Sequence, residues 1–245
     1  MYNLIYLTRG SFGEIYIAYE PILNEKFIIK ITKHSSIFKE ALIHSKLQHK
    51  NIVKLYNYNF IHEKYALLKM EYCNYLSLSD IINCGENLNE DNIIKIILQL
   101  IDVVEYLQNL SIMHGDIKPE NILVNTDFQI KLCDFGASQF ILKNEYLDIF
   151  SGSEKFAPPE ILKGIPYNGF KVDIWSVGII LYILYFGNFP KRKDDFSIVL
   201  NYFDFENKFL YILLNGMLDL NFENRYNILF IKESDWYINA FRKKG

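Results

Sequence analysis

The chain has 245 residues, of which half are hydrophobic and 16% aromatic, and its formal net charge is -3. This composition excludes a disordered polypeptide and supplies enough apolar side chains for a sizeable core. The length fits one large domain or two small ones. The Lys and Arg residues are scattered, so neither charge nor pattern indicates a nucleic-acid partner.

Cysteine usage and the N-terminus indicate an intracellular protein. Cys73, Cys84 and Cys133 are too few and too scattered for a disulfide framework or a zinc site, and reduced thiols are typical of the cytoplasm. The first ten residues lack a basic segment followed by an apolar run, which a secretory signal requires. The longest apolar stretch, 174–187, has 14 residues, too few to span a bilayer. We therefore expect a soluble cytoplasmic protein without a membrane partner.

The first 72 residues predict a small β-rich unit with one helix. β-branched and aromatic runs alternate with Gly, Ser, Pro and Asn turn signals. Ser35 or Ser36 is a candidate cap for a helix that runs to about Leu47. The five predicted strands lie at residues 4–7, 14–19, 26–31, 52–60 and 65–71.

From residue 92 onward the pattern becomes helical. Apolar residues between Ile93 and Leu107 recur at helical spacing, which predicts an amphipathic helix. Residues 122–133 predict a short hairpin, and residues 174–186 a buried helix that is apolar nearly all round. The remaining residues predict shorter helices.

The most informative segment is 114–124, with the sequence HGDIKPENILV. It holds a carboxylate, an ammonium and a carboxamide within six residues (Asp116, Lys118 and Asn121), and Asp134 follows 18 positions after Asp116 in an Asp-Phe-Gly sequence. These groups can supply a base for an incoming hydroxyl, a cation for a migrating phosphoryl group and two oxygen ligands for Mg²⁺.

With these motifs the chain resembles the protein kinases, over residues 4 to about 240. The resemblance implies an α+β, bilobal, protein-kinase-like fold, in which a small five-stranded antiparallel β lobe with one helix precedes a larger, mainly helical lobe. We expect one protein kinase domain over 1–245, with the N-lobe at 1–71, the hinge at 72–75 and the C-lobe at 76–245.

The resemblance also implies an ATP site. The family's glycine loop has three glycines, but Thr8 replaces the first, and on its own the pair Gly10 and Gly13 is as compatible with an ordinary turn. Backbone groups at the hinge, the carbonyl of Glu71 and the amide of Cys73, would meet the adenine. The implied ATP-binding residues are Leu7, Gly10, Gly13, Ile15, Ile28, Lys30, Met70, Glu71, Cys73 and Leu123.

Lys30 interrupts an apolar strand, and a buried lysine is costly unless it is paired. In the family this lysine holds the α- and β-phosphates and pairs with a helix glutamate, for which Glu40 is the best candidate. Only ten residues separate the two, fewer than usual, and His44 stands one turn later where the family has an aliphatic residue. A solvated Glu40 is the alternative.

For the chemical step, the resemblance assigns Asp116 to the substrate hydroxyl and Lys118 to the γ-phosphate. Asn121 and Asp134 are the implied Mg²⁺ ligands, although either could instead stabilise a turn. Lys118 lies in the D-x-K-P-E-N pattern of serine/threonine kinases rather than the pattern of tyrosine kinases.

Further family landmarks follow, with one departure. Gly115 replaces the arginine that commonly pairs with an activation-loop phosphate, so we expect an enzyme that does not need that phosphorylation. Glu160 would pair with Arg225, and Asp173 would accept bonds from the catalytic-loop backbone.

The resulting hypothesis is an ATP- and Mg²⁺-dependent serine/threonine protein kinase that acts on protein hydroxyls. One alternative is a pseudokinase that acts as an ATP-binding scaffold, which Thr8, Gly115 and the short Lys30–Glu40 link would favour. Another is a kinase for small-molecule alcohols. A regulatory protein that presses on the helix around Glu40 is a possible partner, by analogy alone.

Overall fold

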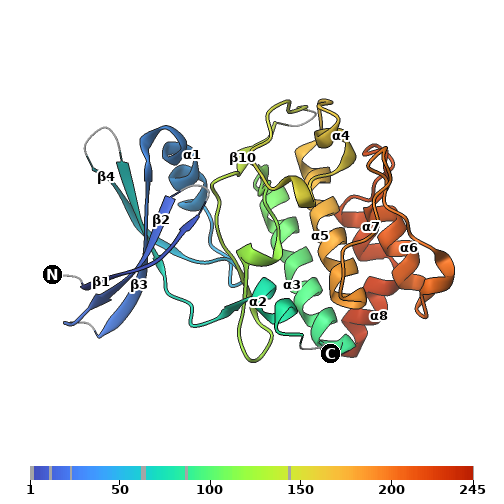
Figure 1. Ribbon diagram of the computed structural model, residues 1–245, viewed down its shortest axis with the longest axis horizontal. Coiled ribbons are helices and arrows are strands. Elements are labelled where there is room, and N and C mark those ends of the chain that lie inside the picture. The colour runs from blue at the N-terminus through green and yellow to red at the C-terminus, as the bar shows by residue number, and fades with distance from the viewer. Residues whose placement is uncertain are drawn as a thin grey trace.

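The computed structural model describes residues 3–10, 13–22, 24–61, 65–85, 88–142 and 145–244, with the side chains of 10, 33–38 and 244 excepted. A twisted antiparallel sheet with one helix forms a small lobe, and helices form a larger lobe beside it (Figure 1). The bilobal α+β expectation is therefore confirmed. The sheet has the order β1-β2-β3-β5-β4, with strands at Asn3–Gly10, Gly13–Glu20, Glu25–Lys33, Tyr65–Glu71 and Leu55–Ile61, respectively.

The helix of the small lobe, α1, spans His34–His44 and follows β3 without a loop. The prediction of a helix from Ser35 or Ser36 to Leu47 was wrong at its end. The amides of Lys46 and Leu47 bond three residues back, to Ile43 and His44, so the chain leaves the α-helix through a tight turn. The capping side chains proposed at Ser35 and Ser36 lie outside the described residues.

Strand β4 begins at Leu55, three residues later than predicted. Ile52 instead forms a bridge with Leu132 of the helical lobe, and the amide of Val53 donates to the Leu132 carbonyl at 3.0 Å. The segment before β4 is thus bound to the helical lobe and cannot join the sheet.

The helical lobe is built around α3 (Glu90–Asn109) and α5 (Gly169–Phe186). The predicted apolar face of α3 is buried, with Ile96, Ile97 and Leu100 fully enclosed. The other helices are α2 (Leu78–Asn83), α4 (Pro159–Leu162), α6 (Lys208–Met217), α7 (Ile228–Glu233) and α8 (Asp235–Lys244).

Short elements close the side of the helical lobe that faces the sheet. The predicted hairpin is confirmed as β8 (Ile122–Val124) and β9 (Ile130–Leu132), which pair antiparallel. The remaining short strands are β6 (Leu76–Ser77), β7 (Ile112–Met113) and β10 (Gln139–Phe140), and 3-10 turns span Pro119–Asn121, Glu154–Phe156 and Tyr202–Asp204.

Helix α5 begins five residues before the predicted start at Ile174. Asn168 caps it, accepting a hydrogen bond from the amide of Phe170. Among the described residues it is the one helix long and apolar enough to cross a membrane by length and composition, yet 67% of it is buried in the protein. Burial on nearly every side explains its continuous apolar sequence, as for the core helix of a globular lobe.

Candidate active site

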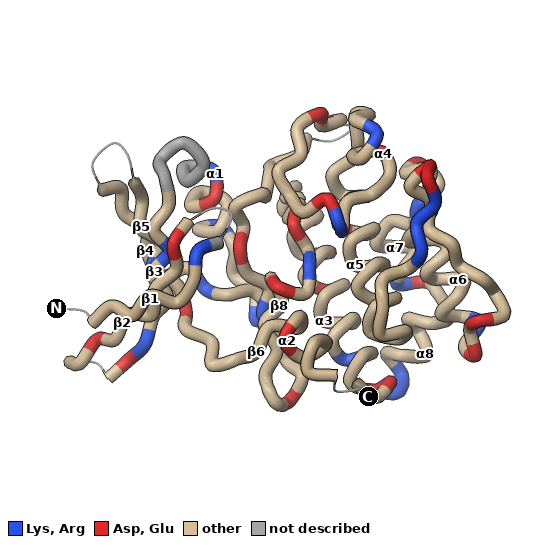
Figure 2. The backbone as a smooth tube through the Cα atoms, in the orientation of Figure 1, with Lys and Arg blue, Asp and Glu red and all other residues tan. Residues whose placement is uncertain are grey.

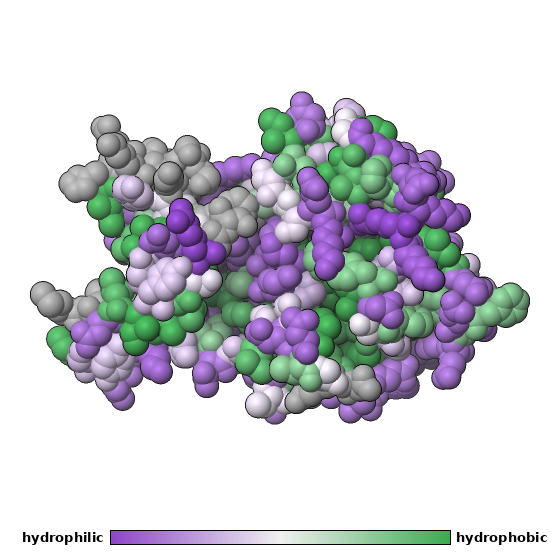
Figure 3. All heavy atoms as spheres, in the orientation of Figure 1, coloured by the Kyte–Doolittle hydropathy of each residue, from purple (hydrophilic) through white to green (hydrophobic). Residues whose placement is uncertain are grey.

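A cleft of about 770 Å³ lies between the sheet and the helical lobe. From the side shown in Figure 3, hydrophobic side chains lie within the hollow between the lobes and hydrophilic ones along its helical side. Its apolar walls come from β1, β2, β3, β5 and β8. Five expected ATP-binding residues form these walls: Leu7, Ile15, Ile28, Met70 and Leu123. A cleft of this size can enclose most of a nucleotide.

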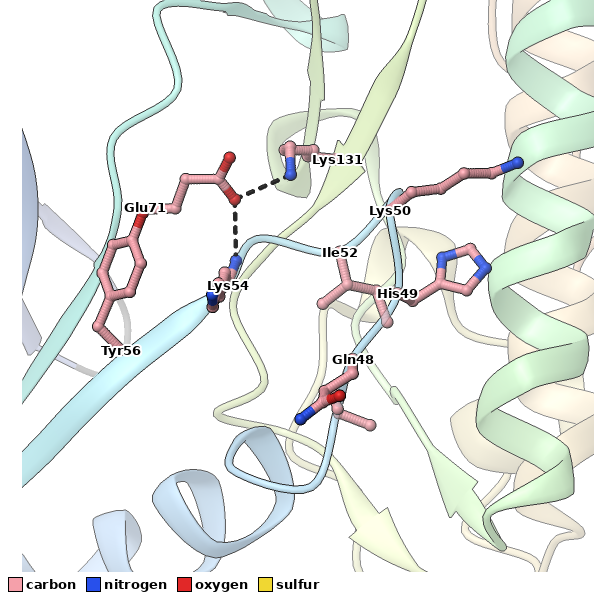
Figure 4. Close-up of a pocket in the computed structure, with 9 residues that line it drawn as sticks. Gln48, His49, Lys50, Ile52, Lys54, Tyr56, Glu71 and Lys131 are labelled. Atoms are coloured by element: carbon pink, nitrogen blue, oxygen red, sulfur yellow. Dashed lines mark hydrogen bonds and ion pairs between the residues drawn. The ribbon is translucent and has the colours of Figure 1, made fainter.

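The hinge side of the cleft presents backbone rather than side-chain groups. The Glu71 carboxylate turns to the reverse side of β5, where Oε2 accepts from Lys131 Nζ at 2.8 Å and from the amide of Lys54 at 3.1 Å (Figure 4). The amide of Cys73 has no hydrogen-bond partner within the described segments. This arrangement leaves the Cys73 amide free for an adenine edge, as the resemblance implies. Lys131 was not recognised in the sequence as the partner of Glu71.

The glycine hairpin closes the roof of the cleft. Gly10 and Gly13 face each other at the end of the β1–β2 ladder, while Thr8 and Arg9 line the cleft itself. Gly13 has a φ of 156°, and a Cβ there would lie 2.4 Å from the carbonyl oxygen of Ile31. Gly13 is therefore required for the close approach of β2 to β3, apart from any contact with phosphate. Ser11 and Phe12, the tip of this loop, lie outside the described residues.

Lys30 and Glu40 meet despite their short separation in the sequence. Lys30 Nζ lies 2.7 Å from Glu40 Oε1 and 2.8 Å from Asp134 Oδ1. Because α1 begins directly after β3, six helical residues suffice to carry Glu40 back over the sheet, about 9 Å along the helix axis. Both side chains are almost fully buried. The alternative of a solvated Glu40 is excluded.

Electrostatics favour the charged forms of Lys30 and Asp134, whereas burial raises the pKa of Glu40. Burial alone would lower the pKa of Lys30, but the carboxylates of Glu40 and Asp134 outweigh it and raise that pKa. For Asp134, burial opposes ionisation, and the neighbouring Lys30 more than compensates and lowers its pKa. The cleft thus holds an ammonium group paired with two carboxylates, in position to exchange one of them for phosphate oxygens.

Three rings in contact, tilted relative to one another, connect α1 to the segment 114–124. The Phe135 ring lies 4.8 Å from the His44 ring and 4.9 Å from the His114 ring, measured between centroids. His44 Nε2 lies 2.7 Å from the carbonyl oxygen of Val53, while its Nδ1 is buried without a partner in the described structure. Burial lowers the pKa of both histidines, that of His44 to about 4. Both are therefore neutral at physiological pH.

Side chains of the segment 114–124, the catalytic loop, meet Ser153, which follows the Asp-Phe-Gly segment in the chain. Lys118 Nζ lies 2.8 Å from Asp116 Oδ2 and 2.8 Å from Ser153 Oγ. The Ser153 amide donates to Asp116 Oδ1 at 2.8 Å. Asn121 Nδ2 donates to the Asp116 carbonyl at 2.9 Å and to its carboxylate at 3.2 Å. The carboxylate of Asp116 is therefore fixed from three sides before any substrate binds.

Two buried carboxylates support this loop from behind. Asp173 accepts the amides of His114 and Gly115 at 2.8 and 2.9 Å, and its burial raises its pKa to about 7. Glu160 forms a bidentate pair with Arg225 at 2.7 and 2.9 Å, with both side chains nearly inaccessible. Both contacts agree with the sequence prediction, and both are structural, because neither carboxylate lines the cleft.

The donor set fits Mg²⁺. Asp134 Oδ1 accepts from Lys30 and from the Gly136 amide, which leaves Oδ2 without a partner among the described residues. The Nδ2 group of Asn121 donates to Asp116, so the side-chain oxygen Oδ1 of Asn121 remains available for a cation. No group of three His, Cys, Asp or Glu side chains with metal-binding geometry occurs in the described parts of the chain. One carboxylate and one amide oxygen suit Mg²⁺, which commonly takes its remaining ligands from phosphates and water.

The fold and this site together are those of the protein kinase class. The protein kinase domain family matches residues 4–237, and the chain belongs to that family. It is 35% identical over 94% of its length to the probable serine/threonine-protein kinase KIN1 homolog of Enterocytozoon bieneusi, and 32% identical over 94% to the carbon catabolite-derepressing protein kinase of Saccharomyces cerevisiae. The chain spans about two fifths of these relatives, 41% and 39% of their lengths.

Proposed function

We propose that this chain is a catalytically competent serine/threonine protein kinase domain, which transfers the γ-phosphoryl group of ATP to a protein hydroxyl with the help of Mg²⁺. The observation that carries the proposal is the position of Lys30, which bonds at once to Glu40 and Asp134, residues separated by 94 positions in the chain. The boundaries we propose are 1–71 for the N-lobe, 72–75 for the hinge and 76–245 for the C-lobe. The free thiols of Cys73, Cys84 and Cys133 support a reducing compartment, the cytoplasm.

The nucleotide end of the cleft works by positioning. The apolar walls at Ile15, Ile28 and Leu123 suit an adenine ring, and the hinge backbone at Glu71 and Cys73 suits its polar edge. Lys30, held in place by Glu40, would direct its ammonium group at the phosphates. Bound Mg²⁺ would neutralise phosphate charge as the bond to the leaving oxygen breaks. Asn121 and Asp134 are the residues that would hold it.

At the acceptor end, Asp116 has the geometry of the group that orients the incoming hydroxyl. Its carboxylate would accept the hydroxyl proton as the new bond to phosphorus forms, while Lys118 would stabilise charge on the migrating group. Lys118 donates to the Ser153 hydroxyl, which holds this part of the activation loop at the acceptor end. Together with Gly115 in place of the usual arginine, this contact supports activity without activation-loop phosphorylation.

The test is transfer from radiolabelled Mg-ATP to one acidic and one basic generic protein, followed by acid hydrolysis to identify the modified residue. We expect phosphoserine and phosphothreonine from the wild-type protein and none from the Asp134→Ala variant. Asp127→Ala is the matched control, because Asp127 is an exposed carboxylate on the β8–β9 turn, away from the cleft. It should retain wild-type activity.

A pseudokinase would give a different result. It would bind ATP, detectable as a rise in melting temperature, yet transfer no label to either protein. The relatives named above are kinases by name, and the pair at Lys30 that the short link put in question is formed. These observations favour an active kinase over a pseudokinase that acts as a scaffold.

A further inference from the structure

Five cationic side chains gather beside the acceptor end of the cleft. They come from the segment after Ser153, from the end of α4 and from the connection between α5 and α6. In Figure 2 the run 191–193 is the continuous blue stretch beside α4. We call this group the basic rim: Lys155, Lys163, Lys191, Arg192 and Lys193.

Hydrogen bonds fix the rim to the acceptor site. Lys155 lines the same cleft as Lys118 and Ser153 and stands only two residues after Ser153. Arg192 Nη2 donates to the carbonyl oxygens of Lys155 at 3.3 Å and Ala157 at 2.8 Å. The segment 191–199 folds back on itself as a narrow loop, in which the Lys193 amide donates to the Ser197 carbonyl at 2.9 Å. Arg192 is therefore held against the chain that follows Ser153, and Lys191 and Lys193 flank it in the loop.

The positive charge of the rim is only partly offset within the protein. None of its five members lies within 4.0 Å of a carboxylate in the described structure, although seven other Lys and Arg side chains do. The neighbouring carboxylates are Glu154, Asp194 and Asp195. Asp195 accepts from the amide and hydroxyl of Ser197, and these bonds, together with the nearby charges of Lys163 and Lys193, lower its pKa. Five cations thus face three carboxylates in a chain whose total charge is negative.

Lys155 is also held in place. Its ammonium nitrogen lies 3.9 Å from the centre of the Phe189 ring, a cation–π contact that fixes the side chain and leaves its charge available. Lys155 is exposed, as are Lys163, Lys191 and Lys193. A fixed, exposed cation needs less ordering on binding than a free lysine, so it contributes more to selectivity.

We propose that the basic rim selects acceptor segments that carry an acidic or phosphorylated side chain next to the serine or threonine. Carboxylates and phosphates form charge-assisted hydrogen bonds with such cations, and a patch of one sign raises the local concentration of an oppositely charged substrate. Glu120, an exposed carboxylate, lines the same cleft. The preference for anionic side chains therefore applies to one flank of the acceptor residue and not to both. This inference rests on the proposed kinase function.

The test is a panel of peptides with one serine in a neutral alanine background. Single Glu, phosphoserine or Arg residues are placed at each of four positions on either side, and kcat/KM is measured for each peptide. We expect about a tenfold gain for Glu over Arg on one flank, since an exposed ion pair contributes up to a few-fold and several can form. The gain should shrink at high salt, because exposed charges are screened. A larger gain for phosphoserine than for Glu would identify a substrate that has already been phosphorylated beside the acceptor. An equal gain would identify an acidic substrate, and both results support the proposal.

Variants assign the effect to the rim. Lys155→Gln and Lys193→Gln should each lower the ratio of kcat/KM for the Glu peptide to that for the Ala peptide, whereas Lys50→Gln should leave it unchanged. Lys50 is the matched control, an exposed lysine in a separate depression behind the hinge. The ratio cancels any general loss of folded enzyme. Transfer with no flank preference, or with a preference for Arg on both flanks, overturns the inference and leaves the kinase function intact. Absence of transfer to every peptide and protein overturns both.

Discussion

His44 is a buried, ionisable ring in contact with Phe135, and it makes the free energy of unfolding depend on pH. Its side chain is 1% exposed, and burial lowers its pKa from 6.5 to about 4. The folded pKa lies below the unfolded one, so unfolded chains bind more protons between pH 4 and 6.5. Stability is therefore complete above pH 6.5 and falls as the pH drops towards 4. At pH 5 these two values correspond to a loss of about 2 kcal/mol.

We expect His44→Leu to remove this loss. The substitution removes the unpartnered Nδ1 but leaves the Val53 carbonyl without its donor, so at pH 7.5 the two effects nearly cancel. Between pH 7.5 and 5 the wild-type melting temperature should fall about 4–8 °C further than that of the variant, since 1 kcal/mol corresponds to about 2–4 °C at this size. The titratable groups near His44, which are Lys30, His114 and Asp134, are present in both proteins.

The assay is thermal unfolding followed by intrinsic fluorescence at pH 7.5, 6 and 5. His49→Asn is the matched control, since His49 is partly exposed and pairs with Asp102 at 3.3 Å, so its removal should change the pH dependence less. Parallel pH profiles for wild type and His44→Leu would refute the reasoning, because they would mean that His44 is already protonated or accessible in the folded protein.

Three further perturbations test other parts of the structure. Glu160→Gln leaves Arg225 charged and 1% exposed, so we expect a loss of about 3–5 kcal/mol in urea unfolding, against no change for the exposed Glu233→Gln. Gly152→Ala would put a Cβ 2.0 Å from the Gly115 carbonyl oxygen, so it should displace Ser153 and lower kcat at least about tenfold while ATP still raises the melting temperature. Chelation of Mg²⁺ with EDTA should abolish most of that ATP-induced rise; an undiminished rise would count against the Asn121–Asp134 site.

The sequence predicts the order of elements and the site motifs because those depend on local patterns. The alternation in β1 to β5 and the periodicity of α3 are properties of short windows. The position of Glu40 is different, because only ten residues separate it from Lys30 and the spacing left a solvated Glu40 as an alternative. In the structure α1 follows β3 without a loop, which brings Glu40 to Lys30.

Contacts between the lobes account for the boundary error at the start of β4. Ile52 and Val53 have the composition of strand residues, yet their backbone bonds go to Leu132. Asn51 reinforces this attachment, since its Nδ2 donates to Gln99 and to the Ile130 carbonyl at 2.8 and 2.9 Å. Partners 48 and more positions away in the chain cannot be inferred from propensity, which tertiary contacts override.

The basic rim could have been found from the sequence only in part. The run 191–193 is visible in the sequence, but its relation to Ser153 depends on the Arg192 bonds to the carbonyls of Lys155 and Ala157. The connection between α5 and α6 has no helical or strand periodicity, so its path follows from such side-chain bonds rather than from a pattern. The position of these charges relative to Ser153 therefore depends on the fold and cannot be derived from the sequence pattern.

Gly115 and Gly152 explain how the activation segment can be ordered without a phosphate. A Cβ on Gly152 would lie 2.0 Å from the Gly115 carbonyl oxygen, so the two backbones approach more closely than any other residue at 152 would allow. This approach brings the Ser153 amide and hydroxyl to Asp116 and Lys118. In kinases with an arginine before the catalytic aspartate, a phosphate-bound cation can hold the segment. Here direct backbone packing and two hydrogen bonds hold the segment around Ser153 where such an ion pair would otherwise act, and we predict that activity does not require a prior phosphorylation.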